Sequence, residues 1–230
     1  MYNTPKYEQE FLKQQAENNA LVRDQLEQKN KDMMQKIHTF CERSGFDFDD
    51  VVKKINSDVM FASTFATDPA KQNLFEKLAG EYIQGIDFIS DFKKLPSSGT
   101  NALYIVSGSL LGGDDLSRSG GSIEAKSIDF SWKYKDKQFY AFHKYTRQSG
   151  GAQDNQYNDM KAFIRNANSS TNQNYYFMAI ADGEYFNTQN GKAGVSKIEN
   201  LKNMANNSMG VYAVRIEELY DVLKTICNVF

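Results

Sequence analysis

Cysteine is scarce in this chain of 230 residues, which has only two. Cys41 and Cys227 lie far apart and match no metal-ligand spacing. The sequence therefore predicts neither a disulfide framework nor a zinc site. A reducing cytoplasm is the expected location.

Long apolar runs are also missing. A helix that crosses a bilayer needs roughly 20 consecutive apolar residues, and no run in the sequence approaches that length. The first ten residues are polar and charged, unlike a signal peptide. We therefore expect a soluble protein with no membrane partner.

A strong basic charge is missing as well, because 27 Lys and Arg stand against 29 Asp and Glu. The net charge of −2 does not by itself indicate nucleic-acid binding, so any DNA-binding surface must be a local patch. Apolar side chains are plentiful, with 40% hydrophobic residues, enough for one sizeable core.

The pattern of the chain changes near residue 95. Lys6 to Arg43, in one helix or two, and then the chain to about Phe92 carry apolar residues at helical spacing. The block Lys93 to Thr100 contains Pro, Ser and Gly and ends that pattern. We predict a helical N-terminal region over residues 1–95 and an α/β domain over residues 96–230.

The second part of the chain predicts a β-sheet. Ser127 to Tyr134 alternates apolar and polar residues as one strand, and Phe139 to Thr146 returns as its hairpin partner. A helix follows from about Gln153, and Tyr175 to Ala181 is typical of a buried central strand. Gly112 to Ser122 is expected to be a loop. The predicted fold class is α/β (α+β), a mixed sheet flanked by helices.

This order resembles the common core of the PD-(D/E)XK nucleases, whose catalytic groups lie on the two strands of a hairpin. The resemblance is carried by Ser127 to Phe130 on the first strand and Phe142 to Lys144 on the second. Lys144 to Gln156 and Ala179 to Phe186 look like segments of type II restriction endonucleases. The resemblance implies a restriction-endonuclease-like sheet and a bacterial enzyme.

The resemblance implies that Asp129 and Lys144 are catalytic, with Gln153 near water or phosphate. A phosphodiester is an anion attacked by hydroxide, so the site needs Mg²⁺ and positive charge. Asp129 would bind Mg²⁺ and Lys144 would orient the attacking water. Strand alternation places His143 on the opposite face from Lys144, which predicts a structural role for this histidine.

One position departs from the family pattern. Phe142 stands two residues before the lysine, where a second acidic residue is expected, and a phenyl ring cannot bind Mg²⁺. In some related nucleases this carboxylate has moved to the following helix, which makes Asp154 and Asp159 candidate metal ligands. Glu81, from the preceding helical region, is a third candidate.

A competing register exists upstream of the hairpin. Glu124-Ala125-Lys126 is a literal Glu-x-Lys, and Asp114 or Asp115 precedes it. We rank this register lower because the glycine-rich loop between them offers no paired strand to hold an aspartate.

The expected function is that of a type II restriction endonuclease acting on double-stranded DNA. A homodimer is expected because a palindromic site matches a two-fold protein. Two other interpretations stay open: a non-catalytic DNA-binding module on a degenerate nuclease fold, suggested by Phe142, and a helical interaction protein. Polar residues after the lysine are the candidates for DNA contacts: Arg147, Gln148, Ser149, Asn155 and Gln156.

Overall fold

The computed structural model describes residues 4–118, 125–147, 151–191 and 194–229. The chain forms two compact units, one of residues 6–75 and one of residues 76–230 with the first five residues. The expected boundary after residue 95 differs from this division, because α5 (Leu74–Gln84) and β1 (Ser90–Lys94) then fall on the helical side. The structure instead gives most of α5 and all of β1 to the unit that contains the sheet.

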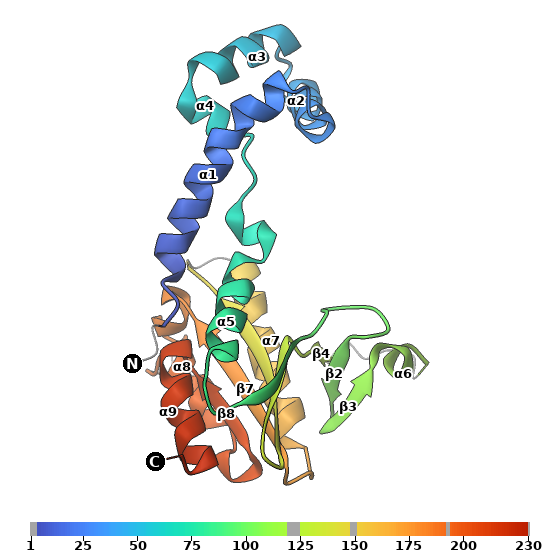
Figure 1. Cartoon of the computed structure of the whole chain (residues 1–230), viewed down its shortest axis with the longest axis vertical. Helices are drawn as coiled ribbons and strands as arrows, with labels where there is room; N and C mark the ends of the chain where they lie inside the picture. The colour runs from blue at the N-terminus through green and yellow to red at the C-terminus, as the bar shows by residue number, and fades with distance from the viewer. Residues whose placement is uncertain (1–3, 119–124, 148–150, 192–193, 230) are drawn as a thin grey trace. The chain divides into compact units, whose positions relative to one another are not determined.

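The first unit is entirely helical in its described residues (Figure 1). Lys6 to Arg43 forms two helices, and Asn30 caps the second by accepting hydrogen bonds from the N–H groups of Asp32 and Met33. The helices are α1 (Tyr7–Glu27), α2 (Lys31–Ser44), α3 (Phe48–Ser57), α4 (Val59–Ser63) and the 3-10 turn η1 (Pro69–Gln72). Their shared core contains Val22, Leu26, Met33, Ile37, Val51, Ile55, Ala62 and Phe65.

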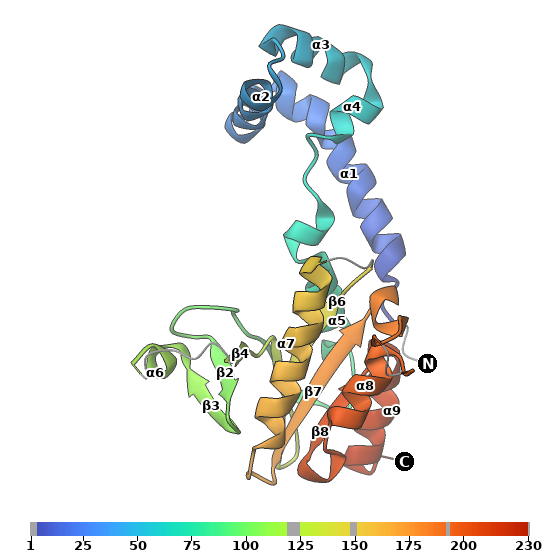
Figure 2. The same ribbon diagram turned by 180° about the vertical axis from the view of Figure 1, so that it is seen from behind.

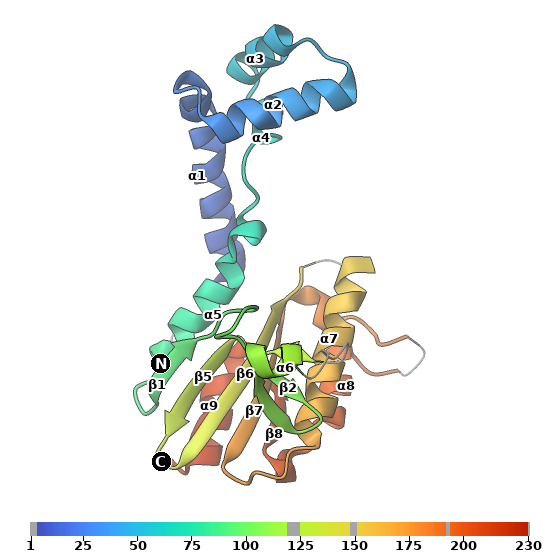
Figure 3. The same cartoon turned by 90° about the vertical axis from the view of Figure 1, so that its right-hand side faces the viewer.

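The second unit is built on a five-stranded mixed sheet in the order β1-β5-β6-β7-β8 (Figure 3). The strands after β1 are β5 (Phe130–Tyr134), β6 (Lys137–Tyr145), β7 (Tyr175–Asp182) and β8 (Val211–Val214). The pairs β1/β5 and β5/β6 are antiparallel, and β6/β7 and β7/β8 are parallel. The expected mixed sheet flanked by helices, with helices at the N-terminus, is confirmed.

Helices cover both faces of this sheet. Figure 1 shows α5 and α9 (Ile216–Cys227) in front of it, and Figure 2 shows α7 (Gly151–Asn168) and α8 (Lys197–Met204) on the other side. On the α5 face, a Cβ at Gly80 would lie 3.1 Å from the Phe130 ring. On the α7 face, the ring of Phe142 stacks on that of Phe163 at 5.4 Å. Two further 3-10 turns are η2 (Glu184–Asn187) and η3 (Asn207–Met209).

A smaller three-stranded sheet, in the order β3-β2-β4, precedes the hairpin. Its elements are β2 (Leu103–Val106), β3 (Ser109–Gly112), α6 (Gly113–Arg118) and β4 (Lys126–Ser127). The expectation of a loop over Gly112 to Ser122 is therefore wrong for residues 113–118. Asp114 and Asp115 lie in the first turn of this short helix.

The expectation of one regular strand over Ser127 to Tyr134 is also wrong. Ser127 belongs to β4 of the small sheet, and β5 begins at Phe130. Ile128 packs with the α7 side of the core, whereas Phe130 faces Gly80 of α5. Residues two apart in a regular strand face the same side, so the chain is irregular at Asp129, which lies between them.

In the described part of the chain, no helix combines the length and the apolar character that a membrane crossing needs.

The β2–β3 turn is fixed against the end of α7, and this contact gives a test of the fold. Ser107 donates its N–H to Oδ1 of the buried Asn166 at 2.6 Å. Gly108 has φ +83°, and a Cβ there would clash with the Ser169 carbonyl. We expect Gly108→Ala to lower the free energy of unfolding by about 2 kcal/mol or more, because backbone strain and steric overlap add.

Gly191→Ala is the matched control. Gly191 also has a positive φ, +55°, but nothing lies within 4 Å of its Cβ position. Gly191→Ala should lower the free energy of unfolding by only about 1 kcal/mol, which is the cost of the backbone conformation. Urea denaturation measures both variants, and equal losses would show that the turn does not pack against α7 as described.

Candidate functional site

Asp129 is held at the point where β5 begins. Its N–H donates to the Ala141 carbonyl at 2.8 Å, and its own carbonyl accepts from the N–H of Leu95 at 2.8 Å. One carboxylate oxygen, Oδ2, accepts from the backbone N–H of His143 at 2.7 Å. The side chain is therefore fixed between β6 and the segment that follows β1.

The carboxyl group of Asp129 is buried, with 4% of the residue exposed. Loss of solvent raises its pKa above the usual value of 3.8, while Lys144 and the hydrogen bond from His143 act in the opposite direction. Glu76 raises the pKa further by like-charge repulsion, and the His143 side chain lowers it slightly. A buried carboxyl group that has a shifted pKa and a lysine neighbour is typical of functional sites.

Lys144 is half-buried near the end of β6. Its ammonium group lies 4.4 Å from the centre of the Phe142 ring, so the two side chains share one face of the sheet. Lys144 follows His143, whose N–H binds the Asp129 carboxylate, and its positive charge lowers the pKa of that carboxyl group. The structure thus brings together the two residues that the resemblance predicted to be catalytic.

His143 points to the opposite face, as strand alternation predicts. Its Nε2 lies 3.2 Å from Oδ2 of Asp182, and Oδ1 of Asp182 accepts from the N–H of Ile216 at 2.9 Å. Both side chains are buried. The pair links β6 to the end of β7 and to the start of α9, which is a structural role.

Glu76, in the first turn of α5, is the acidic residue that sequence reasoning missed. It raises the pKa of Asp129 by charge repulsion and forms an ion pair with Lys94 at 2.9 Å. Glu76 precedes Gly80 and Ile83 by four and seven residues, on the helical face that packs against the sheet. This helical spacing is the sequence signal that predicts that Glu76 faces the sheet.

The three predicted helix carboxylates have other contacts. Glu81 is exposed on α5 and pairs with a lysine one turn earlier at 3.8 Å. Asp154 accepts a hydrogen bond from the hydroxyl of the buried Tyr185. Asp159 forms an ion pair with Lys126 at 2.7 Å. None of the three is among the groups that shift the pKa of Asp129.

The remaining predicted residues lie at the start of α7 and just before it. Gln153 is half-buried in the first turn of α7, and Gln156 accepts from the Thr146 hydroxyl at 2.5 Å. Arg147 and Asn155 are exposed. The three further residues Gln148, Ser149 and Glu124 lie outside the described part of the chain.

The donor set can be tested for Mg²⁺. Within the described residues, no group of three or more His, Cys, Asp and Glu side chains could hold a metal ion. Mg²⁺ is commonly bound by one or two carboxylates, with water and substrate phosphate completing its shell. Asp129 fits this smaller requirement, because the described residues engage its Oδ2 and leave Oδ1 available.

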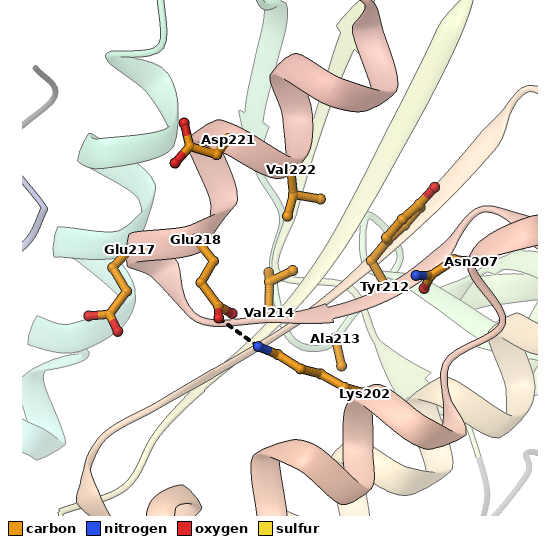
Figure 4. Close-up of a pocket in the computed structure, with 9 residues that line it drawn as sticks. All are labelled: Lys202, Asn207, Tyr212, Ala213, Val214, Glu217, Glu218, Asp221 and Val222. Atoms are coloured by element: carbon orange, nitrogen blue, oxygen red, sulfur yellow. Dashed lines mark hydrogen bonds and ion pairs between the residues drawn. The ribbon is translucent and has the colours of Figure 1, made fainter.

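A separate hollow lies at the other edge of the sheet, between α8, β8 and α9 (Figure 4). It measures about 470 Å³, and an ion pair of 2.6 Å between Lys202 and Glu218 lies within it. None of the predicted site residues lines it, and acidic groups outnumber its one lysine, which disfavours a polyanion. Its lining residues are Lys202, Asn207, Tyr212, Ala213, Val214, Glu217, Glu218, Asp221 and Val222.

Comparisons with known proteins give little. No family model and no curated protein match the chain. Among solved structures, the protein VC1899 from Vibrio cholerae aligns over 100% of this chain and 58% of its own length, at 11% identity and a TM-score of 0.35. A likeness this weak does not identify the family.

The raised pKa of Asp129 predicts how the fold responds to pH. A carboxyl group whose pKa is higher in the folded state stabilises the fold below its unfolded value near 3.8, and this contribution is lost as pH rises through the folded value. Asp129→Asn removes the ionisation and keeps an acceptor for the His143 N–H. We expect the variant to be more stable than the wild type at pH 7, where the buried carboxyl group of the wild type has to ionise.

Thermal and urea unfolding between pH 3 and pH 8 measure this effect. The gain in stability of Asp129→Asn over the wild type should vanish at the acidic end of this range and grow as pH rises. Glu81→Gln, which changes an exposed carboxylate, should show no such growth. A loss of stability in Asp129→Asn at every pH would mean that the carboxylate stabilises the fold.

Proposed function

We propose that this protein is a Mg²⁺-dependent endonuclease that hydrolyses phosphodiester bonds in double-stranded DNA, of the type II restriction class. The observation that carries the proposal is the convergence of Asp129 and Lys144. The buried carboxylate before one strand accepts a hydrogen bond from the N–H of His143, the residue next to Lys144 on the hairpin partner. Burial of the Asp129 carboxylate lowers the stability of its charged form, so such a group beside a lysine is often functional. A carboxylate and an ammonium group are what attack on a phosphate anion requires.

Asp129 would bind the metal through Oδ1. The His143 N–H holds Oδ2 and so orients the carboxylate. Bound Mg²⁺ would lower the pKa of a water molecule and neutralise charge on the phosphate. Fixing the carboxylate in advance reduces the reorganisation needed when substrate arrives.

Lys144 would position the attacking water and stabilise the negative charge that develops on the phosphate. Contact with the Phe142 ring limits the conformations of its side chain. Glu76 is the second acidic group in this proposal, in place of the Asp154, Asp159 or Glu81 expected from the sequence, and it would act on Asp129 from the α5 face, opposite to Lys144. Its ion pair with Lys94 keeps it beside the sheet rather than in solvent.

The connectivity also supports the proposal. The hairpin β5–β6, the crossover helix α7 and the strand β7 parallel to β6 follow the order that the resemblance implies. A cytoplasmic bacterial enzyme acting as a homodimer on a palindromic DNA site belongs to the same proposal.

A non-catalytic DNA-binding module is the second candidate, and one observation favours it. Phe142 replaces the expected acidic residue, and its ring stacks on Phe163 in the core rather than facing a metal. Such a module would bind duplex DNA and leave it intact in the presence of Mg²⁺.

Digestion of unmethylated phage DNA with and without Mg²⁺ separates the two candidates. We expect discrete fragments only with Mg²⁺, and sequencing of the fragment ends gives the recognition site. Asp129→Asn and Lys144→Ala should each lower the cleavage rate by at least about 100-fold, since each removes a group that acts on the transition state. Glu76→Gln should lower it less, because Asp129 remains.

Glu81→Gln is the matched control for Glu76→Gln on the same helix, and it should cleave at the wild-type rate. Full activity in both Asp129→Asn and Lys144→Ala would exclude this site and favour the register at Glu124 and Lys126. DNA binding without any cleavage would favour the non-catalytic module.

A further inference from the structure

Strand β1, at the edge of the sheet, contains a β-bulge. Ser90 pairs with Lys133, yet Lys93 pairs with Ser131, so three steps along β1 match two along β5. Asp91, within the bulge, has φ +52°, a left-handed conformation. One extra residue in a strand reverses the face of every side chain that follows it.

The side chains after the bulge show this reversal. Phe92 stacks on Phe130 at 5.9 Å, and Lys94 reaches Glu76 of α5, so both lie on the α5 face. Lys93, between them, lies on the opposite face. A regular strand continuing from the Ser90 pair would have placed Lys93 opposite Phe130, on the α5 face.

The face that Lys93 shares is the one that carries Lys144. Lys93 pairs with Ser131, and Ser131 pairs with Tyr140 of β6. Tyr140 packs against the core on the α7 side, the side of Phe142 and Lys144. The Leu95 N–H, two residues after Lys93, donates to the Asp129 carbonyl, so Lys93 and Asp129 are diagonal neighbours across two strands.

We propose that the bulge in β1 turns Lys93 onto the catalytic face, where its ammonium group binds a backbone phosphate of the DNA next to the scissile one. This inference rests on the proposed function and adds to it a residue that positions the substrate. Lys93 is exposed and has no ion-pair partner among the described residues. Lys94 and Lys133, its neighbours in the sheet, are paired with Glu76 and Asp91.

The physical alternative is that Lys93 only protects an edge strand from pairing with another chain. The two roles differ in their dependence on salt. A lysine that neutralises a phosphate releases a counterion, so its removal lowers the slope of log K against log salt by about 1. An edge lysine that touches no DNA leaves the slope unchanged.

The test measures binding of the full chain to a fluorescent duplex containing the cleavage site, by anisotropy between 50 and 300 mM salt. Ca²⁺ replaces Mg²⁺ so that the DNA stays intact. Lys93→Ala should reduce the salt slope by about 1. It should also lower the affinity for cognate and non-cognate duplexes by the same factor, roughly 3-fold to 10-fold. Lys93→Arg should restore both values.

Lys135→Ala is the matched control, because it removes the same charge from an exposed position in the turn between β5 and β6, at the end of the hairpin away from Asp129. Its salt slope should equal that of the wild type. An unchanged slope in Lys93→Ala, or equal losses in both alanine variants, would overturn the inference while cleavage by the wild type leaves the proposed function intact. A wild type that neither binds nor cuts DNA would overturn both.

Discussion

The hydrogen bond from the His143 backbone N–H to the Asp129 carboxylate is the constraint on which the site depends. It ties the residue before β5 to the far end of β6, just beyond the pairing of β5 with β6. A carboxylate with 4% exposure ionises readily only when donors and cations compensate for the lost water. Lys144 and the His143 N–H compensate only in part, and Glu76 adds repulsion, so the pKa of Asp129 stays above its usual value.

Much of the fold could be predicted from the sequence, because its central elements have strong hydrophobic patterns. The hairpin, the helix α7 and the buried strand β7 agree with periods of two and 3.6 residues and with a continuous apolar run. Strand β1 was missed because Ser90–Lys94 is a mostly exposed edge strand with four polar residues among five. Its pairing with β5 is a tertiary contact that local pattern does not encode.

The candidate site was predictable only in part, for a related reason. Asp129 and Lys144 lie on hairpin partners, so the short turn between their strands brings them together and sequence alone can pair them. Glu76 comes from a helix far away in the sequence, and only its spacing from Gly80 and Ile83 marks the face that meets the sheet. Asp154 and Asp159 have the right charge at the right distance along the chain, but in the structure Asp154 bonds to Tyr185 and Asp159 pairs with Lys126.

Two irregularities, at Asp91 and at Asp129, decide which charges reach which face. At Asp129 the break sends Ile128 and Phe130 to opposite sides, so the carboxylate lies where two strands separate rather than within a continuous ladder. At Asp91 the bulge exchanges the faces of Lys93 and Lys94, so one lysine neutralises Glu76 and the other remains available on the side of Lys144. A regular sheet would reverse these two lysines, which would leave Glu76 without its cation and the face of Lys144 with one positive charge fewer. Bulges often lie beside active sites for this reason, since they aim a side chain that strict alternation would turn away.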